Sequence, residues 1–551
     1  MQGRTVAARE FRRLTGQGGA AFLAPRAGPP PTRESALQVE KIMDIEGALD
    51  ALPNLYPGPG GVAGIVREGR VVAARSWGFA DLAARRPMTE ALRLPICSIS
   101  KQFTCAALLA EIGDPARLDD RLAGYLPRFR DRLPTTRQLC DNQSGLRDYW
   151  ALTVLQGARA EQTFRREDAL PLLARMKTGH FAPGSRYSYS NGNFRLLAEM
   201  LEAATGEDLA TLYTRHIFGP AGMEAAALVP DTRHPPDGVT GYEGTLDTGF
   251  FPADNGIWWK GDAGISASLT DMLAYEAWID ATRDDPGALY SRISSPASFA
   301  DGSPAPYGYG LSRGQEGGLA VTGHGGALRG FRAYRIHARE ARLSVVVMFN
   351  HQADAQSAAR SLFRRMLDLP DPAMVPPSEI WDGHWLCRET GLSARIDGGT
   401  APRLRYATSP EPLTFRDGGL EATGIRLERG EGGMLMTRSA DRLSAQLEPL
   451  PPADREIPEG HFRSDELEAE MVLMPAAGGL YVGFSGMLGQ GPMELARPLA
   501  PDIWLVATRR SMDAPAPGDW TLRLRRDGAG RITGAELGCW LARGIAYRRQ
   551  G

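Results

Sequence analysis

The sequence predicts an α/β domain followed by two small antiparallel β-domains. Strand-like and helix-like apolar patterns alternate as far as residue 368. Two proline-rich breaks follow, at 369–378 and 450–458, and beyond them short alternating runs replace the helical period. We expect an N-terminal extension, the α/β domain and two β-domains over residues 1–40, 41–368, 369–450 and 451–551.

The α/β domain begins with a predicted hairpin. Strands at 61–66 and 71–77 flank a turn at 67–70. Apolar residues spaced by three and four predict a helix from Ser98 to Leu109, with Ser98 at its N-terminal end. Further helices are predicted at 169–176, 194–204 and 355–367, and a strand at 344–348.

A similar short motif follows each proline-rich break. The motif is Gly-His-Trp at 383–385 and Gly-His-Phe at 460–462, and an acidic residue and a leucine come shortly after each. This similarity predicts two related domains, each an antiparallel barrel or sandwich.

The composition argues against several classes of protein. The 63 Lys and Arg residues nearly balance the 65 Asp and Glu residues, so no nucleic-acid or anionic-membrane partner is expected. No apolar run reaches the length of about 18 residues that a membrane span needs. Five cysteines without CxxC spacing predict neither disulfides nor a zinc site, and free thiols fit a cytoplasmic protein.

Residues 1–40 are basic and rich in Gly and Pro. No apolar segment of signal-peptide length lies among them. We expect a disordered extension, with a cleaved targeting peptide as the alternative.

The first candidate for chemistry is the pair Ser98 and Lys101. Residues three apart share one face of a helix, so the hydroxyl and the amine would meet. A serine needs a neighbouring base, and a desolvated lysine can lose its proton near pH 7. Taken alone, the pair also fits an N-cap serine with a surface lysine.

Two further motifs follow in order. Tyr189 offers a phenol that could relay a proton, and Asn191 offers an amide donor and acceptor for a substrate. His324 precedes Gly325 and Gly326 at a predicted strand, where glycines permit close approach of a substrate. Each motif alone also fits an ordinary structural role, namely a buried tyrosine, a turn asparagine or a turn histidine.

In this order the three motifs resemble those of the serine β-lactamases and penicillin-binding proteins. His324 stands where that set has a lysine, and the Tyr-x-Asn form is similar to class C β-lactamases and D-Ala-D-Ala peptidases. Longer segments narrow the resemblance to bacterial D-aminopeptidases, over about residues 45–549. These segments are 95–106, 142–150, 323–330 and 510–515.

The resemblance implies a β-lactamase-like antiparallel sheet with flanking helices, followed by two antiparallel β-barrels. It also implies that a loop of the last barrel sets specificity through Asp513. A carboxylate there would hold a free α-ammonium and reject a blocked one; without the resemblance, Asp513 would be interpreted as a turn acid. The implied catalytic residues are Ser98, Lys101, Tyr189 and His324, and the implied substrate-binding residues are Asn191, Gly325, Gly326, Ala327 and Asp513.

The activity implied is release of small N-terminal D-amino acids, such as D-Ala, from peptides and amides through an acyl-enzyme. Substrates would carry a free amine, β-lactam nuclei would inhibit, and no metal or organic cofactor is needed. A homodimer is also implied. Which of Lys101 and Tyr189 is the base stays open. The alternatives are an esterase, a D-Ala-D-Ala carboxypeptidase or β-lactamase-like hydrolase of the same superfamily, and a non-catalytic penicillin-binding-like protein.

Overall fold

The computed structural model describes residues 45–370, 375–377, 381–453, 456–514 and 517–551. The extension expected over residues 1–40 therefore lies outside the described residues. Within the described part, the domain order is an α/β domain followed by two β-domains, which confirms the predicted fold class.

An eight-stranded antiparallel sheet is the framework of the α/β domain, in the order β11-β12-β13-β14-β15-β1-β2-β3. The first strand lies beside the last, with Gly61 opposite Phe349, so the two ends of the domain's chain meet within one sheet. Glu68 and Gly69 form the first hairpin turn, and both have the positive φ that a two-residue turn of this kind requires. The strands are β1 (Gly60–Arg67), β2 (Arg70–Asp81), β3 (Arg86–Pro87), β11 (Tyr307–Gly308), β12 (Leu311–Glu316), β13 (Leu319–Leu328), β14 (Phe331–Ala338) and β15 (Leu343–Phe349).

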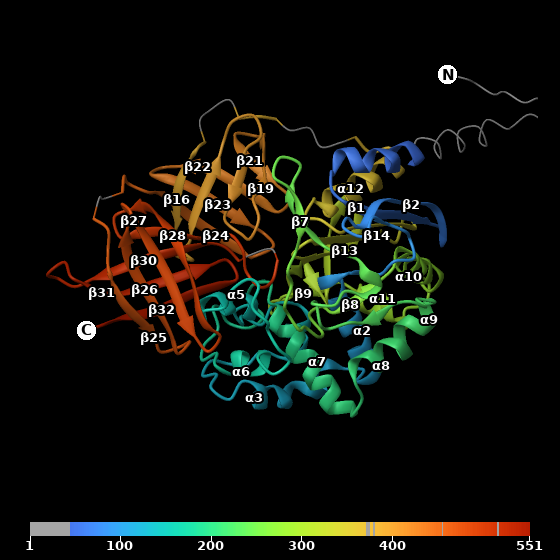
Figure 1. Ribbon diagram of the computed structural model, residues 1–551, viewed down its shortest axis with the longest axis horizontal. Coiled ribbons are helices and arrows are strands. Elements are labelled where there is room, and N and C mark those ends of the chain that lie inside the picture. Colours follow the sequence, from blue (N-terminus) through green and yellow to red (C-terminus); the bar gives the residue numbers. More distant parts are fainter. Residues whose placement is uncertain (1–44, 371–374, 378–380, 454–455, 515–516) are drawn as a thin grey trace, which may run out of the picture. The chain divides into compact units, whose positions relative to one another are not determined.

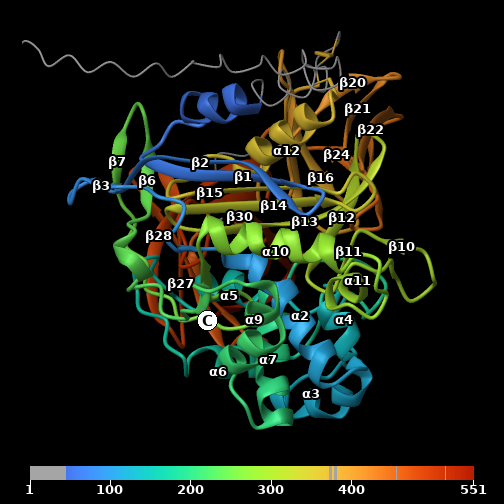
Figure 2. The same ribbon diagram turned by 90° about the vertical axis from the view of Figure 1, so that its right-hand side faces the viewer.

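Helices cover both faces of this sheet, as Figure 2 shows. The helical residues 45–55 and α12 (Ala355–Met366) pack on one face against Val345 and Val347. The opposite face is covered by α10 (Leu269–Ala281) and by the helical part of the domain. Because both faces are covered, β15 is buried along its whole length, which explains its continuous apolar sequence.

The helix α2 (Ser100–Glu111) runs through the middle of the domain, and its first ten residues are buried. A 3₁₀ turn over Cys97–Ile99 precedes it, so the predicted helix is present but begins as a tighter turn. The predicted helix at 169–176 ends earlier, at Ala174. The other helices include α3 (Leu122–Tyr125), α4 (Thr136–Cys140), α5 (Tyr149–Leu155), α6 (Ala169–Ala174), α7 (Asn191–Thr205), α8 (Leu209–Tyr213), α9 (Gly219–Ala221) and α11 (Leu289–Ile293). Short strands are β4 (Leu94–Pro95), β5 (Ala227–Leu228), β6 (Tyr242–Thr245), β7 (Gly249–Pro252), β8 (Ile265–Ala267), β9 (Ala297–Ser298) and β10 (Pro304–Ala305).

The first β-domain is a curled nine-stranded antiparallel sheet. Its edge strands β19 and β20 are consecutive in the chain and only Leu413 separates them, so the sheet must curl until its edges nearly meet. The motif at 383–385 opens β16 at the centre of the sheet. The strands are β16 (Gly383–Cys387), β17 (Ser393–Asp397), β18 (Arg403–Arg405), β19 (Glu411–Pro412), β20 (Thr414–Arg416), β21 (Gly419–Ala422), β22 (Ile425–Gly430), β23 (Gly433–Arg438) and β24 (Leu443–Pro449).

The second β-domain is a closed eight-stranded barrel, visible in Figure 1. The second motif opens its first strand, β25, which pairs with the last strand, β32, and closes the barrel. The strands are β25 (Gly460–Ser464), β26 (Ala469–Ala476), β27 (Gly479–Gly486), β28 (Gly489–Ala500), β29 (Ile503–Thr508), β30 (Gly518–Arg526), β31 (Ile532–Cys539) and β32 (Ala542–Gln550).

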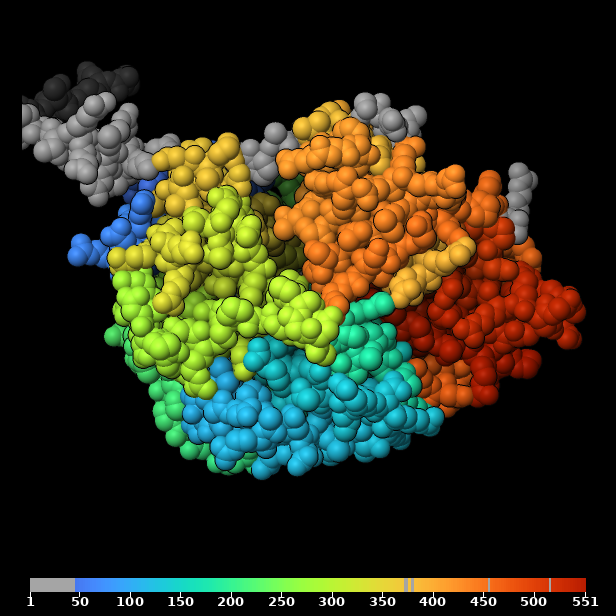
Figure 3. Space-filling model, turned by 180° about the vertical axis from the view of Figure 1, so that it is seen from behind, coloured from blue at the N-terminus to red at the C-terminus, as the bar shows by residue number. Residues whose placement is uncertain are grey.

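Side-chain contacts join the three domains, and Figure 3 shows the β-domains (orange and red) against the α/β domain. Trp540 donates a hydrogen bond of 3.0 Å to Asp441 of the first β-domain. The ring of Trp540 also lies 6.2 Å from the ring of Tyr187, centre to centre. One barrel residue thus contacts both other domains. All five cysteines are unpaired and buried, and no helix among the described residues has the length and apolar character of a membrane span.

A buried ion pair links the central sheet to α10. Arg335 on β14 makes two hydrogen bonds to Glu276, at 2.5 and 2.8 Å, and neither side chain is exposed. Removing one charge from such a pair leaves the other unpaired in a low-dielectric environment.

We therefore expect Glu276→Gln to lower the free energy of unfolding by about 3–5 kcal/mol, because Arg335 loses its counter-charge. The exposed Glu340→Gln, in the same domain, should change it by less than about 0.5 kcal/mol. Urea unfolding followed by fluorescence measures both. Equal stability of the two variants would contradict the proposed importance of the pair.

Candidate functional site

The turn over Cys97–Ile99 leaves Ser98 partly accessible. Ser98 is partly exposed, whereas its neighbours Cys97 and Ile99 are buried. Cys97 has a φ of +50°, an uncommon conformation for a residue with a Cβ, and its thiol contacts the Pro95 carbonyl at 3.4 Å. This strained turn holds the Ser98 hydroxyl at the N-terminal end of α2.

Lys101 is fully buried and directed at Ser98. Its Nζ lies 2.9 Å from Ser98 Oγ, 2.8 Å from Asn191 Oδ1 and 2.6 Å from the Asp262 carbonyl oxygen. Burial lowers the pKa of Lys101 to about 8, and the nearby charge of Asp262 opposes the shift. About a tenth of this amine is therefore neutral at pH 7, and this neutral form can act as a base for Ser98.

Tyr189 completes the contact with the hydroxyl. The Ser98 hydroxyl is close enough to oppose the rise that burial causes in the pKa of the Tyr189 phenol, and Lys101 Nζ lies 4.9 Å from the centre of the Tyr189 ring. Burial raises the pKa of Tyr189 well above its usual value, so the phenol keeps its proton at neutral pH. Of the two groups, the amine is the stronger candidate for the base, and the phenol is suited to relay a proton.

Asn191 is the first residue of α7, and protein groups occupy its side chain. Its Nδ2 donates to Asp148 Oδ1 at 3.0 Å, while its Oδ1 accepts from Lys101. Asp148 also accepts the Asn191 main-chain N–H at 2.6 Å and caps α5 through the Ala151 N–H at 3.2 Å. Burial raises the pKa of Asp148 to about 6. In this arrangement Asn191 orients Lys101, and Asp148 orients Asn191.

Asp262 is a second buried carboxylate beside Lys101. Its Oδ2 accepts hydrogen bonds from the Tyr149 hydroxyl at 2.9 Å and the Trp150 indole at 3.2 Å. Burial raises its pKa. Sequence reasoning missed both acids: Asp148 lies inside the segment 142–150, but Asp262 belongs to no motif that could have revealed it.

His324 lies on β13 and has a fixed, neutral ring. Its Nδ1 lies 2.6 Å from the Gly325 carbonyl, so Nδ1 carries the proton and Nε2 accepts from Tyr307, at 3.0 Å. Burial and the Lys101 charge lower the pKa of His324 to about 3. The β-lactamases and penicillin-binding proteins have a charged lysine at this motif position. The neutral imidazole of His324 does not supply that positive charge. Tyr307 was not singled out from the sequence.

The two glycines after His324 have different surroundings. A Cβ on Gly326 would lie 2.2 Å from the Ile96 carbonyl oxygen, whereas a Cβ on Gly325 would have ordinary contacts, the nearest at 3.4 Å. Gly326 therefore lets β13 approach the turn that carries Ser98. Ala327, the next residue, lies opposite Arg332 on β14.

Asp513 comes from the loop between β29 and β30 of the barrel. Its charge raises the pKa values of Lys101 and Cys97, and burial raises its own pKa. Arg510 anchors this loop to the α/β domain through ion pairs of 2.5 Å to Glu161 and 2.6 Å to Glu243.

The structure brings together the side chains that the sequence placed far apart. Ser98, Lys101, Tyr189 and Asn191 form one contact network, and the His324 ring lies 6.0 Å from the Tyr189 ring. Within the described segments, no three His, Cys, Asp or Glu side chains gather closely enough to hold a metal ion.

Comparison with known proteins divides the chain as the fold does. Residues 46–368 match the family described as Beta-lactamase, and residues 374–548 match the family described as D-aminopeptidase, domain B. A D-aminopeptidase of Cereibacter sphaeroides is 59% identical over 92% of this chain and 98% of its own length. One from Brucella melitensis is 48% identical with the same coverage.

Among solved structures, the fold is similar to that of the octameric penicillin-binding protein homologue from Pyrococcus abyssi. The TM-score is 0.50 at 17% identity, over 83% of this chain and 98% of the other. At this identity the likeness concerns the fold alone.

We expect Gly326→Ala to slow acylation of Ser98 by a fluorophosphonate at least tenfold, because the new methyl group would displace the turn that holds Ser98. Gly314→Ala on the adjacent β12 is the matched control, since a Cβ there meets nothing within 4 Å. Mass spectrometry measures the labelling rate of each protein. Wild-type labelling of Gly326→Ala would show that the close approach of β13 has no part in positioning Ser98.

Proposed function

The chain belongs to the D-aminopeptidase family of β-lactamase-like serine hydrolases, and from this premise we propose that it is a D-stereospecific serine aminopeptidase. It releases small N-terminal D-amino acids from peptides and amides. The observation that carries the proposal is the distance of 2.9 Å between Lys101 Nζ and Ser98 Oγ, and the charge of the barrel's Asp513 acts on this lysine.

Acylation begins when neutral Lys101 removes the proton from Ser98. The alkoxide attacks the carbonyl carbon of the first residue, and main-chain N–H groups of Ser98 and Ala327 stabilise the oxyanion. As the C–N bond breaks, the proton held by Lys101 passes, with Tyr189 as relay, to the leaving amine. The amine departs, and the D-aminoacyl group stays on Ser98 as an ester.

Deacylation uses the same groups. Lys101, neutral again, takes a proton from water, which attacks the ester carbonyl. The tetrahedral intermediate collapses, Ser98 recovers its proton, and the free D-amino acid leaves. Neither His324 nor Tyr189 has to ionise, which agrees with the direction of their pKa shifts. The role of His324 is structural: its hydrogen bond with Tyr307 fixes the positions of both side chains beside the site.

Charge explains the preference for a free N-terminus. Asp513 binds the substrate's α-ammonium, and an acylated amine offers no charge for that carboxylate. A D-Ala-D-Ala carboxypeptidase would need a cation for the substrate's carboxylate. The neutral ring of His324 does not provide that cation, which favours the aminopeptidase over this alternative.

Three further features belong to this proposal. β-Lactam nuclei inhibit, because the site shares the serine and lysine arrangement of the penicillin-recognising enzymes. The enzyme is a homodimer. It acts in the cytoplasm, where five unpaired thiols stay reduced.

We expect D-alanine p-nitroanilide to be hydrolysed with a kcat/KM about 100-fold above that of its N-acetyl form, since only the free amine pairs with Asp513. In Asp513→Asn the KM for the free amine should rise about tenfold or more and the discrimination should shrink. Asp527→Asn, at a half-buried acid on another barrel loop, is the matched control. Equal rates for free and blocked substrates in the wild type would rule out the aminopeptidase.

We expect the rate of acylation by p-nitrophenyl acetate, which has no amine, to rise about tenfold per pH unit up to about pH 8 and then level off. The sign follows from the base: Lys101 reacts when neutral, and it becomes neutral as the pH passes its pKa. Asp262→Asn removes a charge that raises this pKa, so its profile should move to lower pH. Burst kinetics measure both profiles, and a flat wild-type profile between pH 6 and 8 would exclude Lys101 as the base.

A further inference from the structure

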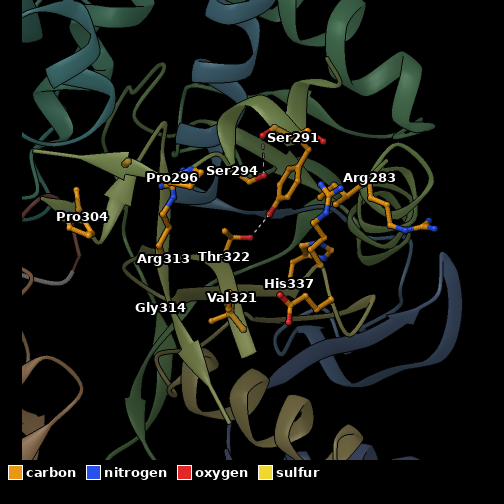
Figure 4. Close-up of a pocket in the computed structure, with 17 residues that line it drawn as sticks. Arg283, Ser291, Ser294, Pro296, Pro304, Arg313, Gly314, Val321, Thr322 and His337 are labelled. Carbon is orange, nitrogen blue, oxygen red and sulfur yellow. Dashed lines mark hydrogen bonds between the residues drawn. The ribbon is translucent and has the colours of Figure 1, made fainter. Parts of the chain in front are cut away.

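A cavity away from Ser98 lies in the α/β domain, between the sheet and the helices α10 and α11 (Figure 4). Its volume is about 390 Å³, within the range of small-molecule sites. Its lining is largely apolar and includes Ile279, Pro296, Ala297, Ala305 and Val321. Figure 4 shows Arg313 and His337 on opposite sides, with Thr322 between them.

Thr322 places a hydroxyl group in this cavity. It lies 2.8 Å from the Tyr290 hydroxyl, which also accepts a hydrogen bond of 2.9 Å from Arg335. In the described part of the chain, Thr322 has no other side-chain partner. Its hydroxyl therefore keeps hydrogen-bonding capacity for a ligand.

His337 and Arg313 add two more polar groups. His337 is only 5% exposed; its Nδ1 lies 2.9 Å from Ser344 Oγ, and Nε2 has no hydrogen-bond partner among the described residues. Burial lowers the pKa of His337 to about 4, so the ring is neutral, and Nε2 is the ring nitrogen left for a ligand.

The charge of Arg313 is only partly offset, by the buried Asp141, whose ion pair is with Arg137. The terminal nitrogens of Arg313 donate to four main-chain carbonyls, those of Gly308, Leu311, Ile293 and Ser295. Its Nε is buried and unpaired, and no ion pair of Arg313 occurs within the described residues. Arg283 and Arg339 also line the cavity, and both pair with Asp284, which lies outside the lining. Glu340 is the one acid among the lining residues.

We propose that this cavity binds a small organic carboxylate with an apolar body. Three arginines, Arg283, Arg313 and Arg339, line the cavity with one acid, Glu340, and this excess of positive charge favours an anion over a neutral acceptor. The Thr322 hydroxyl and the His337 ring can hydrogen-bond to such an anion. The apolar walls and the volume require that the anion carry a hydrocarbon or aromatic part.

The cavity is separate from the Ser98 site but lies on the same strands. Thr322 precedes His324 by two residues on β13, and their partners on β14 are His337 and Arg335. None of the cavity-lining residues belongs to the contact network of Ser98. Binding should therefore leave the serine accessible and stabilise the folded domain.

Isothermal titration of the full-length protein with 4-phenylbutyrate tests the proposal. We expect a Kd of about 1 mM or below and a higher Tm, with 4-phenylbutanamide at least tenfold weaker. Binding should persist after Ser98 has been labelled with a fluorophosphonate. No binding at 10 mM, equal affinity for the amide, or loss of binding after Ser98 labelling would each overturn the proposal.

Variants locate the bound probe. Ala320→Trp, at an exposed lining position, should fill the cavity and abolish binding, and Thr322→Val should weaken it about fivefold by removing a donor. Thr214→Val, whose hydroxyl bonds only the Ala210 carbonyl, is the matched control and should bind as the wild type does. Unchanged affinity in both cavity variants would place the probe elsewhere and overturn the assignment. Circular dichroism verifies that each variant is folded.

Discussion

Desolvation of Lys101 is the constraint on which the site depends. An ammonium buried without compensation would be costly, and here three acids, Asp148, Asp262 and Asp513, offset the cost by proximity. The balance is incomplete, so the pKa falls to about 8 and stops there. In a more apolar environment the pKa of Lys101 would fall further, and the lysine could no longer hold the proton that the leaving amine needs. With more acidic neighbours the pKa would rise, and Lys101 would stay protonated and could not act as a base.

This constraint accounts for the position of α2. The helix must be buried to desolvate Lys101, yet the turn before it must leave Ser98 partly exposed. Two residues make this arrangement possible. The positive φ of Cys97 forms the tight turn before the buried helix, and the missing side chain of Gly326 lets β13 pack directly against that turn.

The barrel contributes more than the loop that carries Asp513. The Asp148 main-chain N–H donates to the Leu541 carbonyl at 3.1 Å, and the neighbouring Arg147 pairs with Glu466 at 2.7 Å. Asp148 holds Asn191, and Asn191 holds Lys101, so barrel residues support the lysine through two intermediates. The barrel therefore supports the site both through these contacts and through the charge of Asp513.

The sequence by itself determined those features that depend on residues close together in the chain or on repeated motifs. The spacing of Ser98 and Lys101 predicts their contact because one helical turn brings them together, and the proline-rich breaks with their following motifs predict two β-domains. The resemblance of ordered motifs to known enzymes then pointed to Tyr189, His324 and Asp513. Tertiary structure alone decided the charge states and the supporting partners. Asp262 contacts Lys101 but lies in no motif. Tyr307 hydrogen-bonds to the neutral ring of His324, and Gly326 packs against the Ile96 carbonyl oxygen. The sequence could not show these contacts, because pKa values and close packing depend on neighbours that are distant in the chain.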